Sequence, residues 1–150
     1  MSKTEWGNAT WYIIHTLSYK LKRSENHHVG SLFKELVHIS TNLPCPDCSQ
    51  HARMYINHAK SVPRNRNELI TFFWGMHNWV NNKLHKPQFS SKDFVAKYDL
   101  ARTSNVIQYY ISIISKNGRY DKAMLSTFNR SIMVTAFIKY INNNIHRFNA

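Results

Sequence analysis

Two cysteines three positions apart, Cys45 and Cys48, have the type and spacing in this 150-residue chain that most clearly indicate chemistry. They are too close together to brace a fold, so the spacing points to redox chemistry or to metal binding. Pro46 suits the first turn of a helix because it lacks a backbone N–H, and Asp47 suits the positive end of the helix dipole. Exposed N–H groups there stabilise a thiolate, and the pair can close into a small disulfide ring that another thiol attacks. The sequence therefore predicts a redox-active pair at the start of a helix that runs to about His58.

The pair is open to three other interpretations. Buried structural cysteines are common, but the flanking prolines and the helix start disfavour that reading here. Zinc could be bound by Cys45, Cys48 and His51 with a distant histidine, but no second CxxC or spaced His pair follows. A thioredoxin-like oxidoreductase needs βαβ units, and no convincing strand precedes the pair. A redox pair in this chain must therefore be held by a helical scaffold.

The elements that would position the pair are predicted to be helices, because the chain has only four Gly and four Pro. A stripe of Leu69, Phe73, Met76, Val80 and Leu84 marks the clearest helix. Ser90 and Asp93 resemble a capping box for a short fifth helix. The predicted helices span residues 4–22, 31–42, the cysteine helix, 67–85 and 91–98, with a loop over 22–30.

The last third of the chain has a different character. Residues 103–116 are apolar and β-branched, so helix and strand both remain open, and Asn117-Gly118 predicts a turn. Residues 121–146 then indicate a helix, whose apolar face is predicted to carry Leu125, Phe128, Ile132 and Ala136. Seven basic residues and one acidic residue give this third +6 of the chain's formal charge of +12.

The strongly basic surface leaves several partners open. It can attract nucleic acid, anionic lipid, an acidic partner or a phosphate-bearing cofactor. A nucleic-acid-binding protein is the runner-up, although no reading motif accompanies the charge; a zinc-binding helical adaptor is a third reading. No run of 18 apolar residues is present, and the first residues lack the pattern of a signal peptide. We therefore expect no membrane span, and location in the compartment where the chain is made.

Three ordered motifs resemble the Erv/ALR family of FAD-linked sulfhydryl oxidases. They are Trp6-Gly7-x-x-Thr10-Trp11-x-x-x-His15, then Leu43-Pro44-Cys45-Pro46-Asp47-Cys48-x-x-His51, then His77-Asn78-x-Val80-Asn81-x-x-Leu84-x-Lys86-Pro87. The match covers about residues 5–100 and looks most like minimal members from large DNA viruses. The resemblance implies that FAD is bound by Gly7, Thr10, Trp11, His15, Tyr19, His51, His77, Asn78, Val80, Asn81, Lys83, Lys86 and Tyr98.

The chain also departs from the family's pattern. His85 stands where the family often has Gly, Tyr98 replaces a Trp that commonly closes the flavin site, and Asn8 stands where cellular members often carry Arg. Many cellular members use a second cysteine pair to pass electrons to the CxxC, and these 150 residues contain no other cysteine. Electrons must therefore come directly from a protein dithiol or from a separate thioredoxin-like partner.

Taken together, the sequence predicts an all-α fold: a four-helix bundle plus a short fifth helix in residues 1–100, and a basic, mostly helical extension in residues 101–150. The resemblance implies a FAD-linked thiol oxidase, a thiol:oxygen oxidoreductase that uses Cys45 and Cys48, reduces O2 to H2O2 and forms homodimers through its first helices. Nucleic acid is not required. The expected location is the host-cell cytoplasm, with association with the virion as an open alternative.

Overall fold

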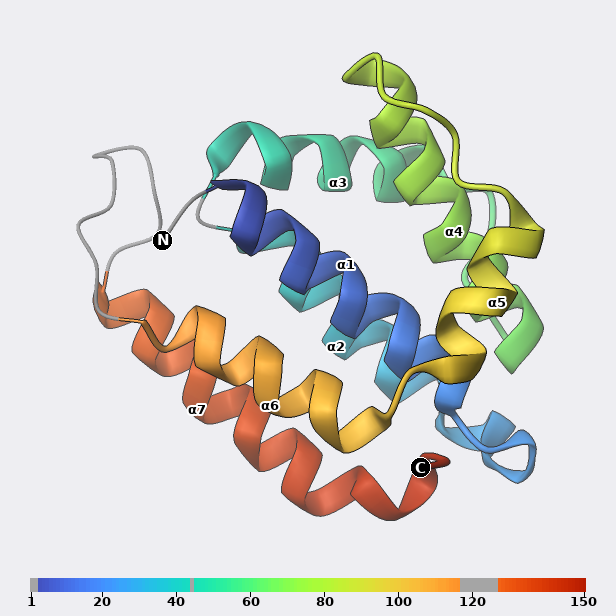
Figure 1. Ribbon diagram of the computed structural model, residues 1–150, viewed down its shortest axis with the longest axis vertical. Helices are drawn as coiled ribbons and strands as arrows, with labels where there is room; N and C mark the ends of the chain where they lie inside the picture. The colour runs from blue at the N-terminus through green and yellow to red at the C-terminus, as the bar shows by residue number, and fades with distance from the viewer. Residues whose placement is uncertain (1–2, 44, 117–126) are drawn as a thin grey trace.

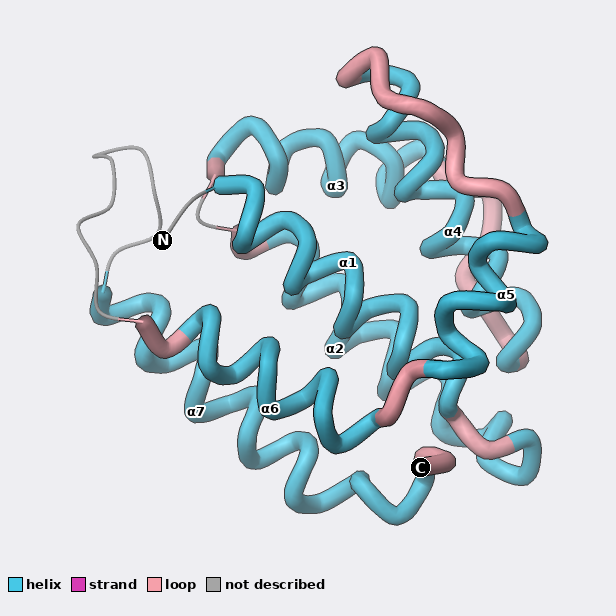
Figure 2. Tube along the Cα trace, in the orientation of Figure 1, coloured by secondary structure: helices cyan, strands magenta, loops and turns pink. Residues whose placement is uncertain are grey.

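The computed structural model describes residues 3–43, 45–116 and 127–150, and within these ranges the regular elements are helices (Figure 1, Figure 2). The all-α fold class predicted from the sequence is confirmed. The α-helices are α1 (Lys3–Lys20), α2 (Val29–Thr41), α3 (Pro46–His58), α4 (Arg66–Lys83), α5 (Ser91–Leu100), α6 (Thr103–Ile114) and α7 (Thr127–Asn144), and two short 3-10 helices are η1 (Arg23–His28) and η2 (Ile145–Arg147).

The middle of helix α1 is buried in the core. Its residues 13–18 are all fully buried, although three of them, His15, Thr16 and Ser18, are polar. Helices α2, α4, α5 and α6 pack against it (Figure 1). Helix α4 also contacts α3, which in turn packs on α2. Because α4 touches both α1 and α3, its two sides can present different residues to each of them.

Most predicted helix limits agree with the structure to within a few residues. The segment over 103–116, which the sequence left open, is helical over Thr103–Ile114. The loop predicted over 22–30 contains η1, and α2 begins at Val29 rather than at residue 31. Ser90 caps α5 as expected, since its hydroxyl accepts the backbone N–H of Asp93 at 3.1 Å. Residues 117, 118 and 121–126 lie outside the described residues.

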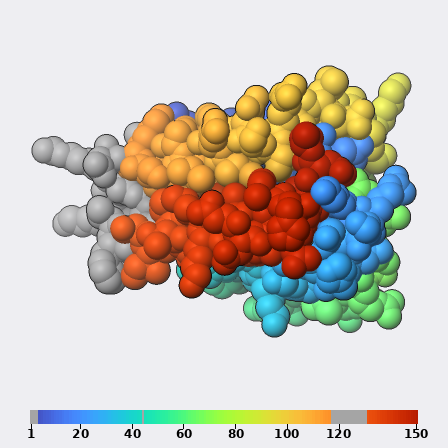
Figure 3. Space-filling view, turned by 90° about the horizontal axis from the view of Figure 1, so that it is seen from below, coloured from blue at the N-terminus to red at the C-terminus, as the bar shows by residue number. Residues whose placement is uncertain are grey.

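The C-terminal helices form part of the main core. Helix α6 lies along α1, and Figure 3 shows α7 between α6 and α2 on one long face of the molecule. The Tyr110 and Phe137 rings meet edge-on, with centroids 4.9 Å apart, and join α6 to α7. The buried stripe of α6 consists of Val106, Ile107, Tyr110, Ile113 and Ile114.

The predicted apolar face of the last helix is wrong. Ile132 is 55% exposed and Ala136 is exposed, whereas Met133, Phe137 and Ile141 are buried. The side chain of Phe128 and all of Leu125 are outside the described parts of the structure. Apolar residues occur on several sides of this helix, so periodicity alone does not select a face. The contact with Tyr110 of α6 selects it instead.

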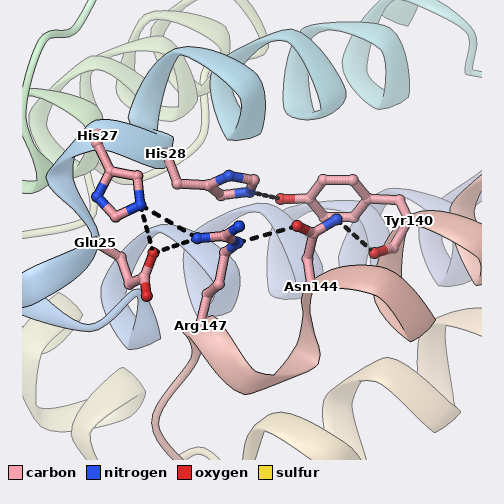
Figure 4. A network of polar contacts seen from close by, with 6 residues as sticks. All are labelled: Glu25, His27, His28, Tyr140, Asn144 and Arg147. Carbon is pink, nitrogen blue, oxygen red and sulfur yellow. Dashed lines mark hydrogen bonds and ion pairs between the residues drawn. The ribbon is translucent and has the colours of Figure 1, made fainter.

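A polar cluster fastens the C-terminus to the connection between α1 and α2 (Figure 4). We call it the C-terminal clasp; it consists of Glu25, His27, His28, Tyr140, Asn144 and Arg147. Arg147 donates to Glu25 at 2.6 Å and to Asn144 at 3.1 Å, and the His28 ring meets the Tyr140 hydroxyl at 2.9 Å. The backbone adds to these contacts, because the Lys22 N–H donates to the Arg147 carbonyl at 2.9 Å and the Asn149 N–H donates to the Lys20 carbonyl at 2.7 Å.

Some of the tail's positive charge is used within the fold. Arg147 pairs with Glu25, and Lys116 at the end of α6 pairs with Glu5 of α1 at 2.9 Å. One pair connects the C-terminal end of α6 to α1, and the other connects the segment after α7 to η1. Because Arg147 and Lys116 attach the tail to the rest of the fold, their positive charge is weaker evidence for nucleic-acid binding.

Candidate active site

The cysteine pair lies at the N-terminus of α3, as the sequence predicts. Cys45 is the N-cap in an extended conformation, and its sulfur accepts the backbone N–H of Cys48 at 3.4 Å. Pro46 occupies the first helical turn with Asp47. Both cysteines are half-buried. The contact shows how the helix start favours a thiolate at Cys45, because a backbone donor already points at its sulfur.

A residue that the sequence reading missed anchors the segment before the pair. Ser49 is buried, and its hydroxyl both accepts the Leu43 N–H at 2.8 Å and donates to the Leu43 carbonyl at 3.2 Å. Arg53, one turn further along α3, donates to the Thr41 carbonyl at 2.7 Å. These bonds fix the end of α2 against the first turns of α3. They therefore hold Leu43, two residues before Cys45, against the start of α3.

An aromatic cluster lies where α1, α4 and α5 meet. The Trp11 and His77 rings stack with centroids 4.0 Å apart and planes 5° from parallel. His15 approaches His77 edge to edge, with 2.8 Å between His15 Nε2 and His77 Nδ1. Phe94 and Tyr98 of α5 pack on the other side of the His15 ring, at centroid distances of 5.1 and 5.3 Å. The structure thus brings together four of the predicted site residues: Trp11, His15, His77 and Tyr98.

Burial keeps both imidazoles of this cluster neutral. It lowers the pKa of His77 to about 4, with help from the positive charges of Lys97 and Lys86. The pKa of His15 is lowered as well, first by complete burial and then by His77 and Lys97. Burial also raises the pKa of the Tyr98 phenol and lowers the pKa of Lys97. Two neutral rings can share one hydrogen bond, with one ring nitrogen donating and the other accepting.

The cluster fits a flat ligand that carries phosphate. Trp11 and His77 are only partly buried, so their stacked rings present a planar wall, and the fields of Lys86 and Lys97 reach that wall. His15 Nδ1 is a buried nitrogen with no hydrogen-bond partner among the described residues. Aromatic walls, neutral donors and acceptors, and nearby cations are the features of a dinucleotide site.

Asn78, which was predicted to bind the ligand, instead holds the loop after α4. The Asn78 amide donates to the Phe89 carbonyl at 2.9 Å and accepts the Phe89 N–H at 2.7 Å. The Trp74 indole N–H donates to the same carbonyl at 2.7 Å. Both amide atoms of Asn78 are thus used inside the protein. Its contribution to a ligand site is to place Phe89 beside the His15 and His77 rings, 6.4 and 5.9 Å away.

The end of α4 has a specific backbone geometry. His85 has φ of 55°, in the left-handed region, and its N–H donates to the Asn82 carbonyl at 3.3 Å. The Lys86 N–H donates to the Asn81 carbonyl at 2.8 Å. These two bonds form a Schellman motif, in which glycine is the favoured residue at the His85 position. The motif directs the chain into the loop that carries Lys86 and Phe89.

The remaining predicted residues divide between the cluster and its surroundings. Asn81 is nearly buried beside the end of α4, and Thr10 is buried with its hydroxyl donating to the Trp6 carbonyl at 2.8 Å. His51 and Lys83 instead converge on Trp79, at 6.2 and 5.0 Å from its ring.

Tyr19 lies at the far end of α1, where its hydroxyl donates to Asp99 at 3.1 Å. Gly7 and Val80 are partly buried. Sequence reasoning missed Phe89, Phe94 and Lys97, because each is marked only by its contacts with residues of other elements.

Metal binding receives no support from the described residues. Within residues 3–43, 45–116 and 127–150, no group of three His, Cys, Asp or Glu side chains has the arrangement of a metal site. In particular, His51 points its ring edge-on to Trp79. The zinc interpretation of Cys45, Cys48 and His51 therefore has no geometric basis in this structure.

The described residues thus form an all-α protein with a CxxC pair at the start of α3 and a cluster of aromatic rings and neutral histidines where α1, α4 and α5 meet. Residues 8–99 match the model of the Erv1 / Alr family, and the chain belongs to that family.

Similar proteins agree with this placement. A putative FAD-linked sulfhydryl oxidase of Invertebrate iridescent virus 3 is 32% identical over 96 residues, which is 62% of this chain and 65% of that protein. The FAD-linked sulfhydryl oxidases ERV1 of Oryza sativa subsp. japonica and Arabidopsis thaliana are 26% and 25% identical over 99 residues, 65% of this chain and 51% and 52% of theirs. The chain thus spans just under two thirds of the viral relative and about half of the plant relatives.

Proposed function

We propose that this chain is a FAD-dependent sulfhydryl oxidase that forms disulfides in protein thiols. The observation that carries the proposal is the position of Cys45 and Cys48 at the N-terminus of α3, inside the segment that matches the family. The relatives' names supply the cofactor and the type of reaction. The aromatic cluster of α1, α4 and α5 is of a kind that suits a flavin dinucleotide.

The proposed cofactor would be held mainly by the aromatic cluster. Trp11 and His77 offer the flat wall, Asn81 and the neutral histidines offer hydrogen-bonding groups, and Lys86 and Lys97 offer positive charge for the phosphates. When bound, FAD supplies a two-electron acceptor that can pass its electrons to O2, giving H2O2. Asn78 and the Schellman motif act indirectly, since they set the course of the loop around this wall.

The proposed reaction begins at the disulfide form of the pair. A substrate thiolate attacks Cys45 Sγ, a mixed disulfide forms, and the bond to Cys48 breaks, leaving Cys48 as a thiolate. A second substrate thiol attacks the mixed disulfide, so the substrate leaves as a disulfide and Cys45 becomes the second thiolate. The substrate has lost two electrons and two protons, and the reduced pair holds the electrons. The family resemblance assigns Cys48 as the cysteine from which they reach the cofactor.

The helix start and the neutral histidines have separate parts in this scheme. The N-terminus of α3 lowers the cost of a thiolate at Cys45, which is the leaving group when the second substrate thiol attacks. The neutral His15 and His77 avoid placing a further positive charge against the aromatic wall. Ser49 and Arg53 keep the cysteine segment in place during the exchange.

The proposal is tested by an absorbance spectrum of the purified protein, followed by oxygen uptake with dithiothreitol. We expect a flavin band, oxygen consumption and peroxide production. Cys45→Ser and Cys48→Ser should each reduce uptake to background while the flavin band remains. Ser112→Ala on the exposed side of α6 provides a control that should retain full uptake. A colourless protein that fails to take up FAD, or turnover that survives Cys48→Ser, would overturn the proposal.

The electron donor and the assembly state are also proposals. These 150 residues contain no second cysteine pair, so we propose direct oxidation of a protein dithiol or of a thioredoxin-like partner. A homodimer through the first helices, as the resemblance implies, meets an obstacle here, because α6 covers α1. A dimer of this chain would need an interface away from the face that α6 and α7 occupy. Light scattering on the eluted protein measures its mass directly.

No helix in the described ranges is both long enough and apolar enough to cross a membrane. One of the similar proteins comes from a virus, and we propose that this chain acts in the cytoplasm of an infected cell. Localisation of the tagged chain in infected cells and in purified virions tests both parts of that expectation.

A further inference from the structure

A second feature of α3 lies along the helix from the cysteine pair. A hollow of about 540 Å³ opens between the C-terminal half of α3 and the side of α4. Residues that line it include Met54, Tyr55, His58, Lys60, Phe72 and Trp79. The aromatic cluster described above does not contribute to it. Side chains two positions apart in a helix point in nearly opposite directions, so His77 faces α1 while Trp79 faces α3.

The apolar side of the hollow is already formed. The Tyr55 ring lies 5.4 Å from the Phe72 ring and 5.9 Å from the Trp79 ring, measured between centroids. Gly75 makes this arrangement possible, because a Cβ there would lie 2.6 Å from the Tyr55 hydroxyl oxygen. Met54 at the edge is 37% exposed. A ligand with apolar groups would therefore meet a fixed aromatic wall and would not have to order it on binding.

The charged edge of the hollow is positive. Lys60 and His58 line it, and the Lys83 ammonium lies 5.0 Å from the centre of the Trp79 ring. Among the described residues that line the hollow, none is acidic. Glu68, one turn before Phe72, already accepts the Arg64 backbone N–H at 2.7 Å. The edge thus complements a negatively charged ligand.

The spacing suits a peptide rather than a small molecule. Tyr55 follows Cys45, the cysteine that the substrate thiolate attacks, by ten residues, which is about 15 Å along a helix axis. An extended peptide covers that distance in about four to five residues. A substrate whose cysteine reacts at Cys45 can therefore place residues about four to seven positions away in the hollow.

We propose that the hollow between α3 and α4 docks a segment of the dithiol substrate that carries acidic and bulky apolar side chains close to its cysteines. This inference rests on the proposed oxidase function and adds the substrate class. The apolar side chains pack on Tyr55, Phe72 and Trp79, and the carboxylates lie near Lys60 and His58. Docking raises the effective concentration of the substrate thiols at Cys45 and does not alter the thiol exchange itself.

The test uses two synthetic peptides that share a reduced Cys-x-x-Cys pair. One continues with a segment of Asp, Glu, Leu and Phe, and the other has Lys in place of the acidic residues. Oxygen uptake is measured for both peptides and for dithiothreitol with the wild-type protein, Lys60→Glu and Met54→Ser. Lys92→Glu is the matched control, because it makes the same charge change at an exposed position of α5 that does not line the hollow.

The wild-type protein should oxidise the acidic peptide with the lower KM. Lys60→Glu should raise that KM about threefold to fivefold, as expected for an exposed charge contact, and Met54→Ser should raise it as well. Lys92→Glu should leave it unchanged, and dithiothreitol oxidation should be equal in all four proteins. Equal KM values for the two peptides, or equal effects of Lys60→Glu and Lys92→Glu, would overturn the docking proposal. Absence of uptake with dithiothreitol would instead refute the oxidase function.

Discussion

The site region and the C-terminal region of this molecule are stabilised in different ways. The site region comprises the start of α3, the end of α4 and the cluster where α1, α4 and α5 meet, and it contains half-buried cysteines, two neutral histidines and a residue with positive φ. The C-terminal region of α6 and α7 contributes apolar side chains to the core and ends in the polar clasp. The site thus keeps polar groups where a ligand can use them, while the tail provides packing. Changes in the two regions should therefore have separable effects on ligand binding and on stability.

Removal of the tail should have the largest effect. A chain that ends at residue 101 loses α6 and α7, which exposes the α1 side chains that α6 covers and removes the contacts that Tyr140, Asn144 and Arg147 make in the clasp. Because folded domains are typically stable by only about 5–15 kcal/mol, we expect the truncated chain to lose its cooperative thermal transition. Circular dichroism during heating measures this. A truncated chain that melts cooperatively and binds FAD would instead establish residues 1–100 as an independent domain.

A pair of alanine substitutions separates the two regions more finely. Phe137→Ala deletes a ring that is 1% exposed in the tail, and should lower the free energy of unfolding by about 3–5 kcal/mol. At temperatures where the Phe137→Ala variant is folded, it should bind FAD as the wild type does. Trp11→Ala removes half of the stacked wall and should cost less stability, because this ring is only partly buried, while FAD is lost. Urea denaturation and the flavin-to-protein absorbance ratio give the two readouts. Loss of FAD in Phe137→Ala at temperatures where it is folded would contradict the separation.

The neutral histidines make the site region sensitive to acid. The pKa of His77 is about 4 in the folded protein and about 6.5 when it is unfolded, so the unfolded chain binds more protons between these values. Stability should therefore fall as the pH decreases from 6.5 towards 4, by up to about 1.4 kcal/mol per pH unit from this residue. The pKa of His15 and the pKa of His28, a clasp residue, are lowered as well, so both residues should add to this loss of stability in acid.

Urea midpoints at pH 7 and pH 5 measure this dependence. His77→Gln should flatten it, and His38→Gln, at an exposed position of α2, should leave it unchanged. An equal pH dependence in wild type and His77→Gln would show that this imidazole does not contribute.

The sequence predicted those features that depend on neighbours along the chain. Pro46 and Asp47 placed the helix start at the cysteines, and Ser90 with Asp93 placed the start of α5, because caps and first-turn residues act within one turn. The stripe of α4 was readable in its first half, where Leu69, Phe73 and Met76 are buried.

Features that depend on contacts between helices were not readable in the same way. The buried face of α7 was predicted incorrectly, since it is chosen by Tyr110 of another helix. Asn78 was expected at the ligand, yet its amide holds the Phe89 backbone, and the Ser49 bonds to Leu43 have no sequence signature. Of the residues that the family motifs identified, the structure brings Trp11, His15, His77 and Tyr98 into one cluster, whereas others, such as His51 and Lys83, lie against Trp79.

The smallest predicted effect concerns His85, which has a backbone φ in the left-handed region although it is not glycine. Its φ of 55° places Cβ close to the following carbonyl, which disfavours every residue except glycine and, to a lesser degree, asparagine. His85→Gly should therefore stabilise the protein by about 0.5–1 kcal/mol, the gain at the C-cap being partly offset by the greater freedom of glycine in the unfolded chain. The control His85→Ala removes the imidazole but keeps the Cβ, and should give no such gain. Urea denaturation of the three proteins decides between a backbone effect, in which only glycine stabilises, and a side-chain effect, in which alanine and glycine change stability alike.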